Sequence, residues 1–283
     1  MGIIVLASGK GSPGVSCTAL ALALAWPLHV PGTTSGPERV LVVEADAAGT
    51  SAVPGYLQGT CSPAAGMATL VGTSRQEMGE RLPQAVIRLE GQPDRYLLPG
   101  LSGPTQMAAH RHTFTDLAGW LRVMTRSDIL VDLGRVGAAA EPSVLVQAAD
   151  LVVVVCRSSM PSVLGALHAV SYLRSLPGSA ADSRPSPIRF LLVGERSPYT
   201  LREVQAALEI QPLGVLAHDA RSAAVFSDGH SPGRGFARGP LMRSASHIAQ
   251  TLTAYLTSET ATVRTSGTTA RPGAKGKAVT GRG

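Results

Sequence analysis

The residues best suited to chemistry lie in a short glycine-rich segment near the start of the chain, Ser8–Thr18. An apolar run at 3–7 precedes it, and an Ala/Leu-rich run that ends at Trp26-Pro27 follows it. Strand, glycine-rich turn and helix form the geometry in which backbone N–H groups and a helix N-terminus bind phosphate. Glycine permits the close backbone approach that such a turn needs. The alternative is an ordinary strand-to-helix turn of an α/β protein. The glycines in the segment are Gly9, Gly11 and Gly14.

Two acidic residues follow apolar runs, and each stands where a phosphate site would hold a metal ion or a water molecule. Asp46 comes after the run 40–43, and Asp132 comes after the run 129–131. Open α/β sheets bind ligands at the carboxyl ends of their strands, and phosphoryl transfer uses carboxylates that orient water or hold magnesium. For Asp46 the alternative is a cap on the next turn. Arg135, just beyond Asp132, is either a phosphate contact or a solvated loop arginine.

The segment from Lys10 to Cys17 resembles the deviant Walker A box of the MinD/ParA family of P-loop ATPases, K-G-G-x-G-K-[ST]-[ST]. The match covers the signature lysine, two of the glycines and the first hydroxyl residue, while Val15 replaces the second lysine. The likeness extends over about residues 1–256, although 51–100 matches no motif. The resemblance implies nucleotide contacts at Gly9, Lys10, Gly11, Ser12, Pro13, Gly14, Val15, Ser16 and Cys17.

The resemblance also implies roles for individual side chains and the cofactors ATP and Mg²⁺. Lys10 would reach across a homodimer to the phosphates of the partner. Ser16, Asp46 and Asp132 would surround the magnesium ion, and Asp46 would also position the attacking water. Further nucleotide contacts are implied for Gly134, in the segment that matches switch II, and for Asp219, near the base.

Alternating apolar runs and helical patterns predict a doubly wound, mostly parallel sheet with helices on both faces. Residues 1–257 would form this P-loop nucleotide-binding domain, and 258–283 a disordered basic tail poor in bulky apolar residues. The short runs 85–89 and 95–98 favour a hairpin. We expect strands near residues 3, 40, 128, 151, 188 and 213, and helices over 105–125, 161–176, 201–208 and 241–256.

Charge and composition narrow the classes of partner. The net charge is +6, but the tail holds five basic residues and one acidic residue, so the rest of the chain is nearly neutral. The tail would attract nucleic acid only weakly and non-specifically. No apolar run approaches the length of a membrane span, and no basic leader precedes the first strand, so a cytoplasmic protein is expected. Three cysteines without C-x-x-C spacing predict neither a disulfide framework nor zinc; Cys17 is either a small filler or a redox sensor.

Two functions of different class fit these residues. The first is an ATP-dependent dimerising switch with slow hydrolysis. With an unknown partner protein it would position a plasmid, a chromosome, or a secretion or pilus machine. The second is a pseudo-ATPase that keeps the fold as a protein-interaction scaffold, which Val15 favours. Non-specific DNA binding would need an ordered basic surface. The candidates for it are Arg221, Arg234, Arg238 and Arg243. We expect clustering of these residues in the fold, away from the nucleotide, to favour partition, and scattered positions to favour placement of a machine.

Overall fold

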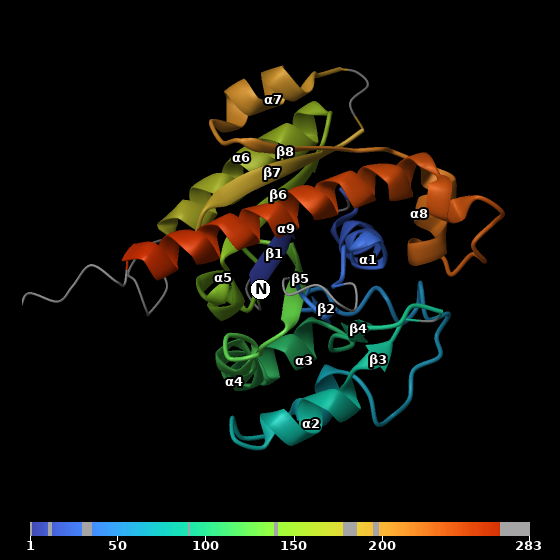
Figure 1. Ribbon diagram of the computed structural model, residues 1–283, viewed down its shortest axis with the longest axis vertical. Helices are drawn as coiled ribbons and strands as arrows, with labels where there is room; N and C mark the ends of the chain where they lie inside the picture. The colour runs from blue at the N-terminus through green and yellow to red at the C-terminus, as the bar shows by residue number, and fades with distance from the viewer. Residues whose placement is uncertain are drawn as a thin grey trace, which may run out of the picture.

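A single sheet forms the centre of the chain (Figure 1). The computed structural model describes residues 2–10, 13–29, 36–89, 91–138, 141–177, 186–194 and 198–266. In these residues eight strands are hydrogen-bonded in the order β3-β4-β2-β5-β1-β6-β7-β8. Every neighbouring pair is parallel except β3 and β4, which form the expected hairpin. The strands are β1 (Ile3–Ser8), β2 (Arg39–Glu44), β3 (Ile87–Arg88), β4 (Arg95–Leu98), β5 (Ser127–Arg135), β6 (Leu151–Arg157), β7 (Ile188–Val193) and β8 (Pro212–Leu216).

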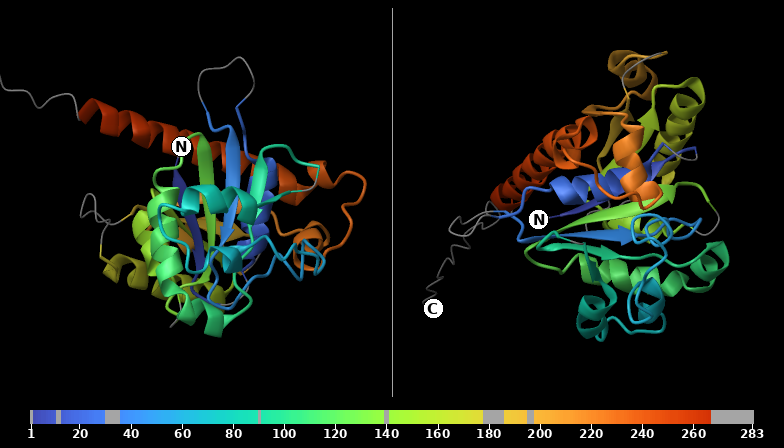
Figure 2. Two further views of the ribbon diagram at one scale, coloured as in Figure 1. Left: turned by 90° about the horizontal axis from the view of Figure 1, so that it is seen from below. Right: turned by 90° about the vertical axis from the view of Figure 1, so that its right-hand side faces the viewer.

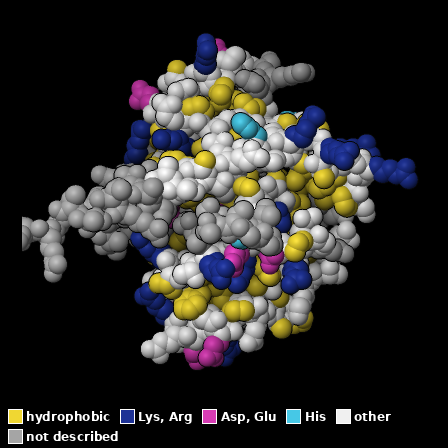
Figure 3. Space-filling model, viewed as in Figure 1, with side chains coloured by type: hydrophobic (Ala, Val, Ile, Leu, Met, Phe, Trp, Pro, Cys, Tyr) yellow, Lys and Arg dark blue, Asp and Glu magenta, His cyan; other side chains and the backbone are white. Residues whose placement is uncertain are grey.

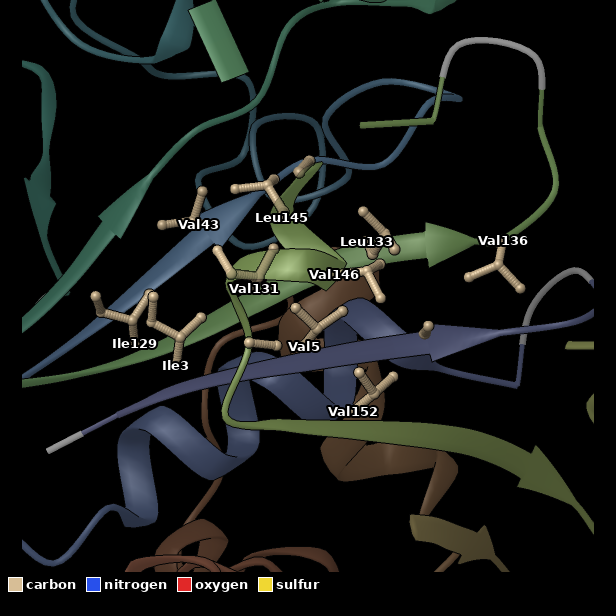
Figure 4. Packing of buried hydrophobic residues seen from close by; sticks show 14 of the residues in the cluster. Ile3, Val5, Val43, Ile129, Val131, Leu133, Val136, Leu145, Val146 and Val152 are labelled. Carbon is tan, nitrogen blue, oxygen red and sulfur yellow. The ribbon is translucent and has the colours of Figure 1, made fainter. Parts of the chain in front are cut away.

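The central strands are apolar on both faces because helices cover both sides of the sheet. Side chains alternate along a strand, so Ile3 and Val5 enter one core while Ile4 and Leu6 enter the other. Figure 4 shows the first of these cores, where Val5 and neighbouring valines and isoleucines lie beside the helix that carries Leu145. Continuous burial of this kind is typical of parallel strands, and the sequence pattern predicted it.

The helices divide between the two cores (Figure 2). One face of the sheet is covered by α1 (Val15–Ala25), α8 (Ala220–Ser227) and α9 (Pro240–Ser266), with the short 3-10 turn η2 (Phe236–Arg238) beside them. The other face is covered by η1 (Met67–Leu70), α2 (Met78–Ala85), α3 (Pro104–Ala109), α4 (Arg111–Leu121), α5 (Ser143–Ala148), α6 (Met160–Ser175) and α7 (Leu201–Leu208).

The strand register brings the candidate site segments to one edge. Strand β5 lies between β1 and β2, and Asp132 pairs with Leu6 on one side and with Glu44 on the other. The carboxyl ends of three neighbouring strands therefore meet at one level of the sheet. Strand β6 flanks β1 on its other side, with Val154 opposite Ala7.

The mostly parallel sheet with helices on both faces confirms the predicted fold class. The region expected as one helix over 105–125 is two, because His110 leaves the helical conformation with φ −110° and ψ 30°. Three helices were not predicted: α2, which contains Pro83; the six-residue α5, too short to show a period; and α8. Helix α9 begins at Pro240 and ends at Ser266, beyond the residue 256 expected from the sequence.

Residues 267–283, which make up most of the predicted basic tail, lie outside the described residues. Among the helices of the described ranges, none combines the length and the apolar character that a membrane crossing requires.

Candidate functional site

A cavity of about 640 Å³ opens at the edge where the strands end. Its polar side is formed by the loop after β1 and the first turn of α1, including Pro13, Gly14 and Ser16. Its apolar side is formed by the end of β8 and by α8, including Leu216 and Phe226. The cavity therefore joins a surface suited to phosphate with a surface suited to a flat apolar ring.

The first turn of α1 presents backbone N–H groups to this cavity. Gly14 caps the helix in the left-handed conformation with φ 98°, and among the described residues no side chain caps the turn by a hydrogen bond. The N–H groups at a helix N-terminus lack partners within the helix and carry partial positive charge. Val15, Ser16 and Cys17 all line the cavity. This turn has the geometry that an anion site requires, while Gly11 and Ser12 of the same loop lie outside the described residues.

The start of the loop packs directly against α6. A Cβ atom added at Gly9 would lie 1.7 Å from the carbonyl oxygen of Gly165, and one at Gly165 would lie 2.6 Å from the Cβ of Lys10. Glycine is required at both positions, since backbone and loop approach too closely for a side chain. Lys10 is exposed beside α6 and does not line the cavity of its own chain.

Asp132 lies beneath the first turn of α1 and is 1% exposed. Its Oδ1 accepts a hydrogen bond from the Gly134 N–H at 3.0 Å. Burial raises the pKa of this carboxyl group to about 7; the Ser16 hydrogen bond opposes the rise, and the charges of Glu44 and Asp46 add to it. A buried carboxyl group next to two further acidic side chains and a hydroxyl fits a divalent cation.

These residues suit a magnesium ion whose coordination is completed by a bound ligand. In the described part of the chain, no three His, Cys, Asp or Glu side chains converge to hold a metal ion by themselves. Mg²⁺ is commonly bound by one or two carboxylates together with substrate phosphates and water. Ser16 and Asp132 would hold the ion at the phosphate end of the cavity, where it would neutralise phosphate charge.

Asp46 reaches the same place from the end of β2. Its Oδ1 accepts a hydrogen bond from the Ala48 N–H at 2.8 Å, so it does cap the next turn. The carboxylate also lines the cavity and lies against Gly134, where an added Cβ would be 2.0 Å from its Cγ. Burial raises the pKa of Asp46. The structure thus combines the capping and the site positions that the sequence left as alternatives.

Glu44, two residues earlier, anchors the loop that follows β2. It is 3% exposed and accepts hydrogen bonds from the N–H groups of Ser51 at 2.9 Å, Ala52 at 2.8 Å and Gly100 at 3.1 Å, and from the Thr50 hydroxyl. A glutamate side chain spans the distance from the strand to this turn. Its oxygens are therefore committed to the loop that positions Asp46.

Two arginines stand at the rim of the cavity, Arg135 at the end of β5 and Arg157 at the end of β6. Both are exposed, and no described carboxylate forms an ion pair with either guanidinium. The sequence pointed to Arg135 but not to Arg157. Only the strand order reveals Arg157, because β6 lies next to β1 and its loop.

Asp219 lies at the apolar end of the cavity, where it begins α8. Its carboxylate accepts hydrogen bonds from the N–H of Ser222 at 3.2 Å and its hydroxyl at 2.6 Å. The Ser222 hydroxyl is the main cause that lowers the Asp219 pKa. Asp219, predicted as a base contact, therefore lines the cavity while its oxygens cap α8. Behind it, Phe226 stacks on Tyr56 with ring centroids 6.1 Å apart.

The cysteine in the loop behaves as a small packing residue. Burial raises the pKa of Cys17, with contributions from the charges of Asp132 and Asp228, while Arg157 opposes the rise. Thiolate character governs cysteine oxidation. The raised pKa therefore disfavours the redox-sensor alternative.

Together, the parallel sheet, the glycine-rich loop before α1 and the buried aspartate at the end of β5 define a P-loop nucleotide-binding fold. A scan against protein-family models gave no match, and a search of curated proteins gave none either. The solved structures that resemble the chain narrow the class to the MinD/ParA type of P-loop ATPase fold.

Three solved structures illustrate the likeness. Apo McdA from Cyanothece gives a TM-score of 0.65 at 16% identity, covering 89% of this chain and 99% of that chain. The cell division ATPase MinD from Pyrococcus furiosus gives a TM-score of 0.64 at 17% identity, covering 89% of this chain and 98% of that chain. A ParA family ATPase from Chlorobium tepidum gives a TM-score of 0.64 at 15% identity, covering 88% of this chain and 97% of that chain. At this identity the likeness establishes the fold.

Proposed function

We propose that the chain is a nucleotide-dependent switch that binds Mg-ATP in the cavity and positions a cargo such as a plasmid, a chromosome or a secretion or pilus machine. The observation that carries the proposal is the buried Asp132 carboxyl group, which is hydrogen-bonded to Ser16 in the first turn of α1. Solved neighbours of this fold include a MinD protein with Mg-ADP and a McdA–ATP complex, which supports a nucleotide as the ligand.

Slow hydrolysis is part of this proposal. The side chain of Val15 is 6% exposed and packs in the core, so the lysine that P-loops place there has no equivalent at this position. Asp46 stands at the cavity wall, where it would position the attacking water. Loss of the lysine charge would slow transfer because phosphoryl transfer depends on electrostatic stabilisation.

Calorimetric titration of Mg-ATP and Mg-ADP into the purified chain tests the binding step. We expect micromolar binding that Asp132→Asn weakens strongly, because the amide cannot serve as an anionic magnesium ligand. Asp94→Asn is the matched control, since this exposed residue precedes β4 at the opposite edge of the sheet. Equal affinity in both variants would contradict the assignment of Asp132.

We further propose that the ATP-bound chain pairs with a second copy. Lys10 supports this step, because it is exposed beside the site but outside the cavity of its own chain. Light scattering with ATP should show a dimer that Lys10→Ala weakens, while ATP affinity at low protein concentration stays unchanged. Arg81→Ala, an exposed charge removal on α2, provides the control. A dimer that survives Lys10→Ala unchanged would contradict the role.

The second candidate is a pseudo-ATPase scaffold, and Val15 favours it. In that case no heat of binding would appear with millimolar ATP or ADP, and Asp132→Asn would alter only the stability of the fold. The titration therefore separates the two functions, because the switch requires binding and the scaffold excludes it.

A further inference from the structure

Negative charge gathers at the phosphate end of the cavity. Asp46 lines the cavity, while Glu44 and Asp132 are buried close enough to act on it electrostatically. Val15 provides no cation, and Lys10 lies outside the cavity. A bound triphosphate would add further anionic oxygens, so a magnesium ion and backbone dipoles would need help from a side-chain cation.

Arg157 lies where its side chain could supply this positive charge. Strand β6 is the neighbour of β1, and Arg157 comes three residues after Val154, which pairs with Ala7. The end of β6 therefore lies level with the glycine-rich loop. Arg157 lines the same cavity as Ser16 and Cys17. Burial is the main cause that raises the pKa of Cys17, and the Arg157 guanidinium opposes the rise, so its charge acts on the first turn of α1.

The backbone of Arg157 is fixed on both sides. Its N–H donates to the Ser162 hydroxyl at 2.8 Å, and its carbonyl accepts from the Ser159 N–H at 2.8 Å. The next residue, Ser158, exchanges hydrogen bonds with the backbone of Tyr199, which tie the turn to the start of α7. These bonds fix the backbone position from which the Arg157 side chain extends to the cavity.

Arg135 occupies a different kind of position. It follows Gly134, with φ 64°, and precedes Gly137, with φ 80°. Both arginines are the last residue of their strands, but the chain beyond Arg135 enters the glycine-containing segment that in the resembled family is switch II. The chain beyond Arg157 is instead hydrogen-bonded to the start of α6 and to Tyr199 before α7.

We propose that Arg157 is a phosphate-binding residue that supplies, from the end of β6, the positive charge that is missing at Val15. The guanidinium offers several N–H donors to phosphate oxygens. This inference rests on the proposed nucleotide binding and adds a residue outside the loop to the site. It also explains how a site with valine at the lysine position would retain a triphosphate.

The test compares Arg157→Gln with Arg174→Gln, which removes an exposed arginine from the last turn of α6. Calorimetry with Mg-ATP and with adenosine is run on each full-length variant. Loss of charge-assisted hydrogen bonds should weaken Mg-ATP binding by about tenfold or more in Arg157→Gln. Adenosine binding should be the same in both variants, because it carries no phosphate. Arg157→Lys should fall between Arg157→Gln and the unaltered chain.

Thermal unfolding without nucleotide gives the fold control, and we expect no shift for the exposed Arg157 side chain. Equal Mg-ATP affinity in Arg157→Gln and Arg174→Gln would overturn this inference while the proposed function stands. An equal loss for adenosine would overturn it too, because the residue would then act on the cavity as a whole. Absence of Mg-ATP binding in the unaltered chain would overturn the proposed function and this inference together.

Discussion

At the scale of single residues, Asp132 links the stability of the magnesium-free chain to pH. Burial raises the pKa of its carboxyl group from 3.8 to about 7. Because this pKa is higher in the folded than in the unfolded chain, the folded state binds the proton more tightly. The stability that this gives is fully present below pH 3.8 and is lost as the pH rises through about 7. Above that range the buried charge costs up to about 4 kcal/mol.

The prediction concerns the variant Asp132→Asn, which cannot ionise. In urea unfolding with a chelator present, we expect it to be more stable than the unaltered chain at pH 8. The difference should shrink steadily as the pH falls below 7 and should disappear only below the unfolded pKa of 3.8, where Asp132 is protonated in both states. The same variant is expected to lose Mg-ATP binding, so stability and binding would change in opposite directions. Parallel stability profiles across this pH range would show that Asp132 is not the responsible group.

At the scale of elements, the glycine-rich loop depends on α6 as a support. Gly165→Ala would place a Cβ 2.6 Å from the Cβ of Lys10 and 3.1 Å from its backbone nitrogen. Neither atom belongs to a flexible side-chain end, so the loop or the helix must shift. We expect a loss of about 2 kcal/mol in the free energy of unfolding, accompanied by weaker Mg-ATP binding.

The control for this prediction is Gly119→Ala, in the last turn of α4. The three atoms nearest to an added Cβ there all belong to the side chain of Arg75, at 3.1 Å or more, and that side chain can move. Alanine favours helix over glycine by up to about 1 kcal/mol, so stability should hold or increase. Urea unfolding of both variants measures the difference. Equal changes in the free energy of unfolding for the two substitutions would mean that the contact between the loop and α6 makes no specific contribution to stability.

The same elements show which parts of the site the sequence could predict. The β1–loop–α1 segment and Asp132 were found because their signals are local: an apolar run, glycine spacing and a carboxylate at the end of a strand. Arg157 and Gly165 were not found, because their positions in the site depend on β6 and α6 lying beside β1. The order of strands in a sheet cannot be inferred from local sequence patterns. Helix α8 was missed for a similar reason, since its cap, Asp219, was interpreted only as a ligand contact.

At the scale of the whole molecule, an exposed basic corner is the feature that bears on a DNA partner. It consists of Arg221 on α8, Arg234 in the following loop, Arg238 on η2 and Arg243 on α9. The four residues lie in the consecutive segment from α8 to the start of α9. The Nη2 atom of Arg221 lies 3.5 Å from the position that a Cβ atom on Gly233 would occupy. Figure 3 shows dark blue side chains at the corner where α8 meets the start of α9. The expectation for partition required a cluster away from the nucleotide. The arginines do cluster, but their corner adjoins the apolar end of the cavity, which Phe226 and Leu241 line, so only the first half of the expectation is met.

If this corner binds the DNA backbone, affinity should depend on salt through the number of phosphates it contacts. Fluorescence anisotropy with a non-specific duplex, over a salt series with Mg-ATP present, measures that dependence. The double variant Arg234→Gln/Arg238→Gln should reduce the slope of log affinity against log salt by about 2, because each lost phosphate contact removes about 0.9. The control Arg81→Gln/Arg88→Gln removes the same charge from exposed positions on α2 and β3. Both variants keep the basic tail. An equal fall in slope would therefore assign any DNA binding to net charge rather than to this corner. Placement of a protein machine would then be the better-supported role.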